Sequence, residues 1–107
     1  MAVGYESLVE VEITQKDIDN AVAVFNAATV DSYLWKSYYC FNISRNCPIA
    51  QALIRLGYEP EVGTITWVCA ADKKHYLLKE GADYFINKVP SQWRELQPRM
   101  VTIEVPA

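Results

Sequence analysis

The residue best placed for chemistry in this sequence is Cys47, which directly precedes Pro48 at the start of an expected helix. A helix N-terminus offers free N–H groups and a positive dipole end, which lower a thiol pKa and attract anions. Cys47 is therefore a reactive thiol, part of an anion pocket, or a small residue packed beneath the helix; we favour packing. A cysteine nucleophile needs a nearby base. The only histidine is His75, and we do not favour a Cys47–His75 dyad.

A second candidate site is a run of aromatic residues with basic residues beside it. Residues 29–43 contain this run, and their pattern fits neither a helical nor a strand period. Tyrosine and tryptophan bury much area at low entropic cost, so such runs can form ligand pockets or protein interfaces. The alternative, which we favour, is that most of these rings fill a small core. The candidate ligand-binding residues are Tyr33, Trp35, Tyr38, Tyr39, Arg45, Asn46 and Cys47.

No other motif indicates catalysis, metal binding or a cofactor. Structural zinc needs closely spaced ligand pairs, whereas Cys40 and Cys47 are seven residues apart and Cys69 is farther along the chain. There is no phosphate-binding glycine loop and no nucleophile-elbow motif. We therefore expect a protein that is not an enzyme, with no metal site and no cofactor.

Composition narrows the class of protein further. The chain has 107 residues and a formal net charge of −3, and we expect one domain over residues 1–107. Duplex nucleic-acid binders show a basic stripe, but Lys73 and Lys74 form the only basic pair. No run approaches the roughly 20 apolar residues that span a bilayer, and no signal peptide is visible. Without a secretion signal, the three cysteines are expected to be free thiols in a reducing compartment, so we expect a cytoplasmic protein. We also expect no membrane partner.

The elements that position these residues begin with a strand and a helix. Apolar residues alternate with acids over residues 8–13, which predicts a half-buried strand with Val9, Val11 and Ile13 on one face. Thr14 and Asp17 form a capping box, which predicts a helix over residues 15–26 that Asp19 and Asn20 could shorten to two turns. Its buried face is expected to hold Ile18, Val22 and Phe25.

A second helix carries Cys47 at its start. Pro48 suits a first helical turn, and either Asn46 or Cys47 is the cap: Asn46 is the better acceptor by type, whereas Pro48 at the first position favours Cys47. Gly57 is expected to end the helix. The predicted buried stripe is Ile49, Ala52, Leu53 and Leu56, and the predicted outward residues are Gln51 and Arg55.

The rest of the chain predicts a hairpin, a helix and a strand. Trp93 is expected to pin the loop that follows the helix to the body of the domain. Tyr84, Phe85 and Val89 are expected to face inward. The expected elements are a short strand at residues 61–63, strands at 64–70 and 75–78 around a turn at 72–74, a helix at 81–89 and a strand at 100–105. The order β-α-α-β-β-α-β predicts an α+β fold with a single-layer, mostly antiparallel sheet and about three helices.

Two segments of the chain, VEITQKDIDN (residues 11–20) and NCPIAQAL (residues 46–53), carry a family resemblance. They resemble small proteins encoded by bacteriophages and related mobile elements, in which an ITxxDI start precedes a CPIAxAL helix, a hairpin, a helix and a final strand. Residues 76–106 fit the same layout, whereas the aromatic residues 29–43 are an insert. The resemblance implies the cytoplasm of an infected host cell and carries over no catalytic residue.

Three functional hypotheses follow. The first is a non-catalytic phage-type protein that acts by binding, either as an inhibitor of a host defence protein or as a sponge for a nucleotide-type signalling molecule. Bases would stack on the aromatic rings, and phosphates would bind Arg45 or the helix that starts at Pro48. The second is a homo-oligomeric structural or accessory protein with no small ligand. The third is a thiol-dependent enzyme acting through Cys47.

Overall fold

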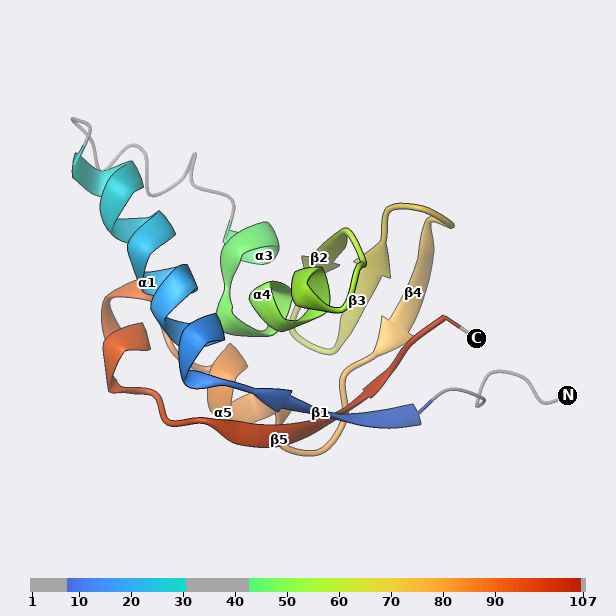
Figure 1. Ribbon diagram of the computed structural model, residues 1–107. Coiled ribbons are helices and arrows are strands. Elements are labelled where there is room, and N and C mark those ends of the chain that lie inside the picture. The colour runs from blue at the N-terminus through green and yellow to red at the C-terminus, as the bar shows by residue number, and fades with distance from the viewer. Residues whose placement is uncertain (1–7, 31–42, 107) are drawn as a thin grey trace, which may run out of the picture.

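The computed structural model describes residues 8–30 and 43–106 of the chain and confirms an α+β fold (Figure 1). Helices and antiparallel strands mix along the sequence. No helix in these two segments is long and apolar enough to cross a membrane. The elements are β1 (Leu8–Ile13), α1 (Gln15–Val30), α3 (Ile43–Asn46), α4 (Pro48–Arg55), β2 (Pro60–Val62), β3 (Thr66–Cys69), β4 (Lys74–Leu77), α5 (Ala82–Ile86), the 3₁₀ helix η1 (Pro90–Glu95) and β5 (Arg99–Glu104).

The described strands form two antiparallel sheets, where the sequence predicted one. One sheet pairs β1 with β5, and the other has the order β2-β3-β4. A single bridge between Leu78 and Ile103 joins them. After this bridge, Lys79 and Glu80 form backbone hydrogen bonds with Thr102, and the chain then turns into α5 at Gly81, whose φ is 90°. A Cβ at that position would lie 2.7 Å from the carbonyl oxygen of Met100, so a side chain would not fit.

Helix α1 begins as the sequence predicts but is longer. The Thr14 hydroxyl accepts a hydrogen bond from the Asp17 N–H at 3.1 Å, and the Asp17 carboxylate accepts one from the Thr14 N–H at 2.9 Å. This confirms the capping box. The predicted end at residue 26 is wrong, because α1 continues to Val30. Alanines in the second half of α1 favour the helix, and Phe25 packs edge-on against Trp93 with ring centroids 6.1 Å apart.

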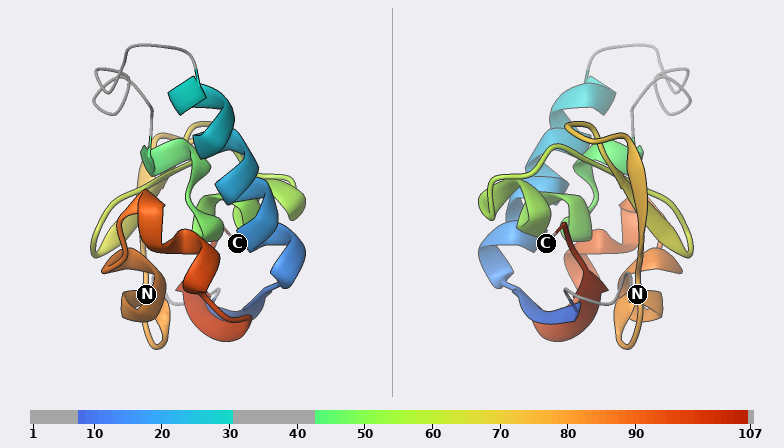
Figure 2. Two further views of the ribbon diagram at one scale, coloured as in Figure 1. Left: turned by 90° about the vertical axis from the view of Figure 1, so that its left-hand side faces the viewer. Right: turned by 90° about the vertical axis from the view of Figure 1, so that its right-hand side faces the viewer.

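Helix α4 lies in the middle of the molecule, between α1 and the three-stranded sheet (Figure 1 and Figure 2). Cys47 is its N-cap, which resolves the choice between Asn46 and Cys47. Gly57, with a φ of 100°, follows the helix as predicted. Ile49, Ala52 and Leu53 are fully buried. The prediction for Leu56 is wrong: this residue is the C-cap, beyond the last turn, and is 46% exposed.

The core gathers around two tryptophans. Trp67 of β3 is fully buried, and its indole N–H donates to the carbonyl oxygen of Glu104 at 2.9 Å, which ties the two sheets together. Trp93 is 1% exposed, which confirms that it pins its segment to the body. Val89 is half exposed rather than inward, because α5 ends at Ile86 and η1 starts at Pro90.

Candidate functional site

Only part of the predicted ligand site falls within the described residues. Tyr33, Trp35, Tyr38 and Tyr39 lie outside them. Arg45, Asn46 and Cys47 lie at the junction of α3 and α4. The structure therefore brings three of the seven candidates together and says nothing of how the aromatic residues contribute.

Cys47 is buried, and its environment is that of a packed residue. Its sulfur accepts a hydrogen bond from the Ala50 N–H at 3.5 Å, and only 9% of the residue is exposed. Burial raises the pKa of the Cys47 thiol from 9.0 to about 11, although hydrogen bonds from backbone N–H groups oppose the shift. The thiol is therefore protonated at neutral pH, which disfavours a nucleophile. Among the described residues no hydrogen bond joins it to His75, which is exposed on β4.

The raised pKa of Cys47 predicts a loss of stability in alkaline solution. In the unfolded chain the thiol ionises near pH 9, whereas in the folded chain it stays protonated to about pH 11. Its contribution to stability is therefore full below pH 9 and falls between pH 9 and 11. Urea unfolding at pH 8 and pH 10.5 should show a larger loss for the wild type than for Cys47→Ala, in which other titrating groups are unchanged. Equal losses, or rapid labelling of Cys47 in the folded protein at pH 7, would contradict the buried thiol.

The start of α4 and Arg45 are poorly suited to phosphate. Pro48, Ile49 and Ala50 are buried, so the first turn of the helix faces the core. Arg45 is held by Glu61, with its Nη2 2.9 Å from Oε2, and both side chains are about half exposed. The hollow beside this pair is also lined by Glu59 and Lys73. A phosphate at Arg45 would have to displace the carboxylate of Glu61, and the repulsion of Glu59 would offset the attraction of Lys73.

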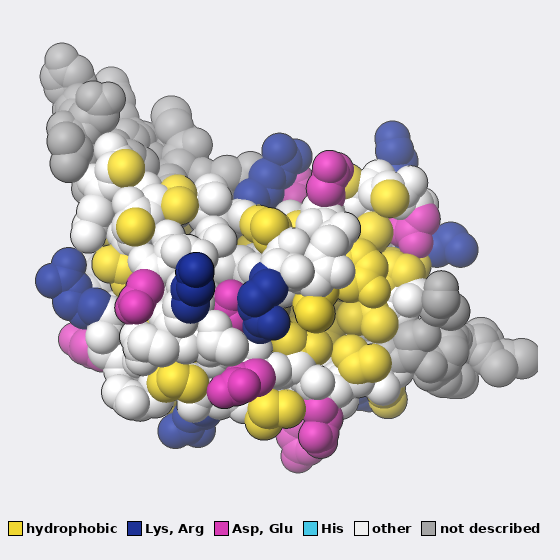
Figure 3. All heavy atoms as spheres, viewed as in Figure 1, with side chains coloured by type: hydrophobic (Ala, Val, Ile, Leu, Met, Phe, Trp, Pro, Cys, Tyr) yellow, Lys and Arg dark blue, Asp and Glu magenta, His cyan; other side chains and the backbone are white. Residues whose placement is uncertain are grey.

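The structure shows a different candidate site, which the sequence did not single out. A hollow of about 430 Å³ lies between β1 and the end of α4. Valines from β1 and from the residue after β5 line one side, and Leu56 and Tyr58 line the other. Figure 3 shows hydrophobic side chains gathered to the right of α4, with acidic side chains below them. We call this hollow the β1–α4 groove; its lining residues are Val9, Glu10, Val11, Glu12, Arg55, Leu56, Tyr58 and Val105.

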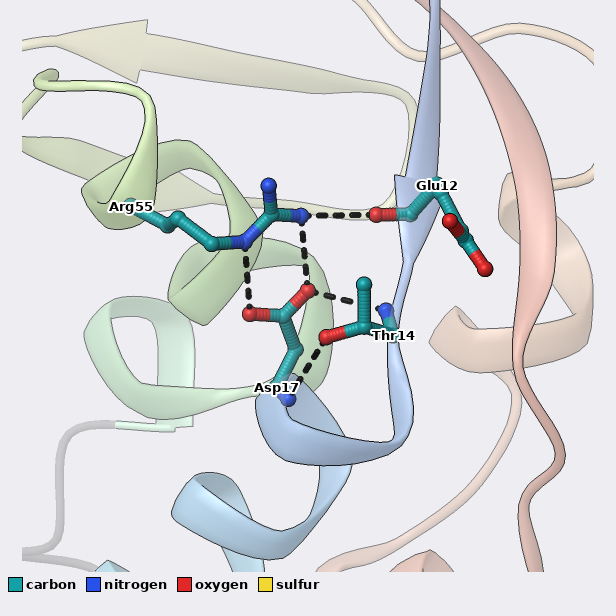
Figure 4. A network of polar contacts seen from close by, with 4 residues as sticks. All are labelled: Glu12, Thr14, Asp17 and Arg55. Atoms are coloured by element: carbon teal, nitrogen blue, oxygen red, sulfur yellow. Dashed lines mark hydrogen bonds and ion pairs between the residues drawn. The ribbon is translucent and has the colours of Figure 1, made fainter.

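Arg55, which lines the β1–α4 groove, forms an ion pair with Asp17 of α1 (Figure 4). Asp17 is 2% exposed, and its carboxylate accepts from Nε and Nη2 of Arg55 at 3.2 and 2.9 Å. Nη2 also donates to the carbonyl oxygen of Glu12 at 2.8 Å. The hydrogen bond to Asp17 raises the pKa of Arg55 above its ordinary value. Arg55 was predicted to face outward, and its side chain is indeed 43% exposed. The prediction missed that its guanidinium also ties α4 to α1 and β1.

Neither a metal-binding cluster nor a similar protein gives further information about the function. In the described segments, no three His, Cys, Asp or Glu side chains lie close enough to hold a metal ion. Comparisons with protein-family models, with curated proteins and with solved structures found no significant match.

Proposed function

We propose that this protein acts by binding another protein through the β1–α4 groove. The observation that carries the proposal is that large apolar side chains stay exposed on both sides of the groove. Val9 is 37% exposed and Leu56 is 46% exposed, and they face the same hollow as Tyr58. Apolar side chains clustered at a hollow beside charged residues are typical of protein interaction sites.

An inhibitor is a better fit to the described residues than a nucleotide sponge. The start of α4 faces the core, and Arg45 is already paired with Glu61 in a hollow whose other charged lining residues are Glu59 and Lys73. The thiol of Cys47 is protonated at neutral pH, which argues against the thiol-dependent enzyme. Together with the resemblance to phage-encoded proteins, these features favour a host protein as the partner, so that the chain would act in the host cytoplasm.

Replacing Leu56 with lysine should abolish capture of the partner. The variant places a charge at the apolar wall of the groove, and Leu56 is half exposed at the end of α4, so folding should be little affected. The measurement is affinity capture from a bacterial lysate with the immobilised wild type and Leu56→Lys, followed by mass spectrometry. A protein retained by the wild type and lost from the variant is the expected result.

The matched control is Ile65→Lys, which changes a 66% exposed residue that lies outside the groove lining. Capture that survives Leu56→Lys, or that is lost equally in both variants, would contradict the groove. A thermal-shift screen against cyclic oligonucleotides tests the sponge in parallel. A nucleotide at a hundred times its dissociation constant should stabilise by about 2.7 kcal/mol, and a clear shift would favour the sponge. Light scattering tests the homo-oligomer, which predicts a dimer or larger species.

A further inference from the structure

The hydrogen bonds of β5 show which backbone N–H and C=O groups of β1 point away from β5. Glu10 lies opposite Thr102 in the β1–β5 register. The N–H of Thr102 donates to the carbonyl oxygen of Glu80 at 2.9 Å, and its carbonyl oxygen accepts from the N–H of Lys79 at 2.8 Å. Both backbone groups of Thr102 thus point away from β1. In an antiparallel pair, residues alternate between hydrogen-bonded and non-hydrogen-bonded positions, so Glu10 and Thr102 form a non-hydrogen-bonded pair.

The backbone groups of Glu10 therefore point to the outer edge of β1, and so do those of Leu8 and Glu12, two residues to either side. The hydrogen bond from Arg55 to the carbonyl oxygen of Glu12 agrees with this assignment. Within the described residues, the N–H and C=O of Glu10 and the N–H of Glu12 have no partner on that edge. An exposed strand edge of this kind is a template for another strand.

We propose that an extended segment of the partner protein pairs with this edge of β1 as an added strand. This inference rests on the proposed function and specifies how the partner binds. In strand addition, backbone hydrogen bonds give affinity, and alternate side chains give specificity. The ion pair of Arg55 with Asp17 closes the edge at Glu12, so the added strand pairs with the part of β1 that runs from Glu12 back to Leu8.

The two faces of β1 define the side chains of the added strand. Val9 and Val11 lie on one face of β1 and line the groove, so neighbouring side chains of the partner on that face would be apolar. Leu8, Glu10 and Glu12 lie on the other face, and all three are exposed. Two carboxylates beside the edge favour basic residues at the alternate positions. The partner segment therefore alternates apolar and basic residues.

A second copy of this chain fits the edge less well. Pairing β1 with β1 of another copy about Glu10 would place the two Glu10 side chains directly opposite each other, and pairing about Val11 would place Glu10 opposite Glu12. Like charges directly opposite destabilise a strand pair. The carboxylates thus select against self-pairing and for a basic partner.

The test uses a synthetic heptapeptide, blocked at both ends, in which lysine alternates with valine. Titrated into ¹⁵N-labelled protein, it should shift the amide resonances of Glu10 and Glu12 most strongly. The same peptide with glutamate in place of lysine should bind more weakly. Methylating alternate amide nitrogens of the lysine peptide blocks one of its two hydrogen-bonding edges. Two such peptides are prepared, one methylated at the odd-numbered amide nitrogens and the other at the even-numbered ones. The peptide whose blocked edge faces β1 should lose binding, and the other should keep it.

Charge variants test the carboxylates. The double variant Glu10→Gln, Glu12→Gln should bind the lysine peptide roughly threefold to tenfold more weakly, the effect of losing two exposed charge pairs. Glu95→Gln is the matched control, because Glu95 is also exposed but lies in η1, outside the groove lining. Binding should be unchanged in that variant.

Three outcomes would overturn strand addition: no binding of the lysine peptide at millimolar concentration, equal binding by the lysine and glutamate peptides, or retention of binding by both methylated forms. These outcomes are separable from failure of the proposed function. If a lysate protein is still captured by the wild type and lost in Leu56→Lys, the groove binds a protein, but by another mode. If capture does not depend on Leu56, the proposed function itself fails.

Discussion

Replacing Arg55 with methionine should lower the free energy of unfolding by about 3 kcal/mol, the lower end of the range for breaking a buried ion pair. The reason is the burial of its partner: Asp17 is 2% exposed, and Arg55 supplies two of the hydrogen bonds that its carboxylate accepts. Methionine keeps the apolar stem of the side chain but leaves a buried carboxylate uncompensated. In a domain of this size the melting temperature should fall by about 12 °C or more.

Replacing the partner residue, Asp17, with asparagine should lower the free energy of unfolding by less. In Asp17→Asn the amide oxygen can still accept from the Thr14 N–H and keep the cap. Arg55 then loses its counter-charge, but its side chain is 43% exposed and can be hydrated. We expect a loss of about 1.5–2 kcal/mol, the lower part of the range for one hydrogen bond that involves a charged group. The double variant should be less destabilised than the sum of the two single variants, because it buries no unpaired charge.

Urea unfolding of the wild type, the two single variants and the double variant measures this coupling. Arg45→Met is the matched control, because Arg45 also pairs with a carboxylate but at an exposed position. That variant should lose less than about 1 kcal/mol. Additive effects of Arg55→Met and Asp17→Asn, or a greater loss in Arg45→Met than in Arg55→Met, would show that the Asp17–Arg55 pair does not hold α1, α4 and β1 together.

The sequence predicts the local features of the fold well, where neighbouring residues determine the structure. The capping box at Thr14 and Asp17 is confirmed because both partners lie within one turn. The start of α4 at Pro48 and its end before Gly57 are confirmed for the same reason. The predictions from the sequence are wrong where contacts between residues far apart in the sequence determine the structure. The division into two sheets depends on pairing between distant segments, in which only one bridge, between Leu78 and Ile103, connects the two sheets.

The candidate site was harder to predict than the fold. Residue type pointed to Cys47 and Arg45, but burial of the thiol and the pairing of Arg45 with Glu61 are properties of the folded chain. The β1–α4 groove depends on which edge of β1 meets β5, and strand order cannot be read from alternation alone. The available signal was the alternation of valines and glutamates over residues 8–13. It predicted that one face of the strand is exposed to solvent, but not that one edge of the strand is unpaired.

Amide hydrogen exchange rates should differ strongly between neighbouring residues of β1. Val11 lies in the hydrogen-bonded set of the β1–β5 ladder, since it alternates with Glu10, whose backbone groups point outward. Amides bonded within a sheet exchange only on local or global opening, whereas unbonded edge amides exchange with little protection. The Val11 amide should therefore exchange at least about 100-fold more slowly, relative to its unfolded-chain rate, than the Glu10 and Glu12 amides.

The most direct test of the open edge is this exchange measurement, made by NMR on the free protein at a concentration where light scattering shows a monomer. The account predicts slow exchange at Val11 between fast exchange at Glu10 and Glu12. Equal protection of all three amides would show that the outer edge of β1 is already paired in the free protein. It would contradict both the open edge and the strand addition inferred from it.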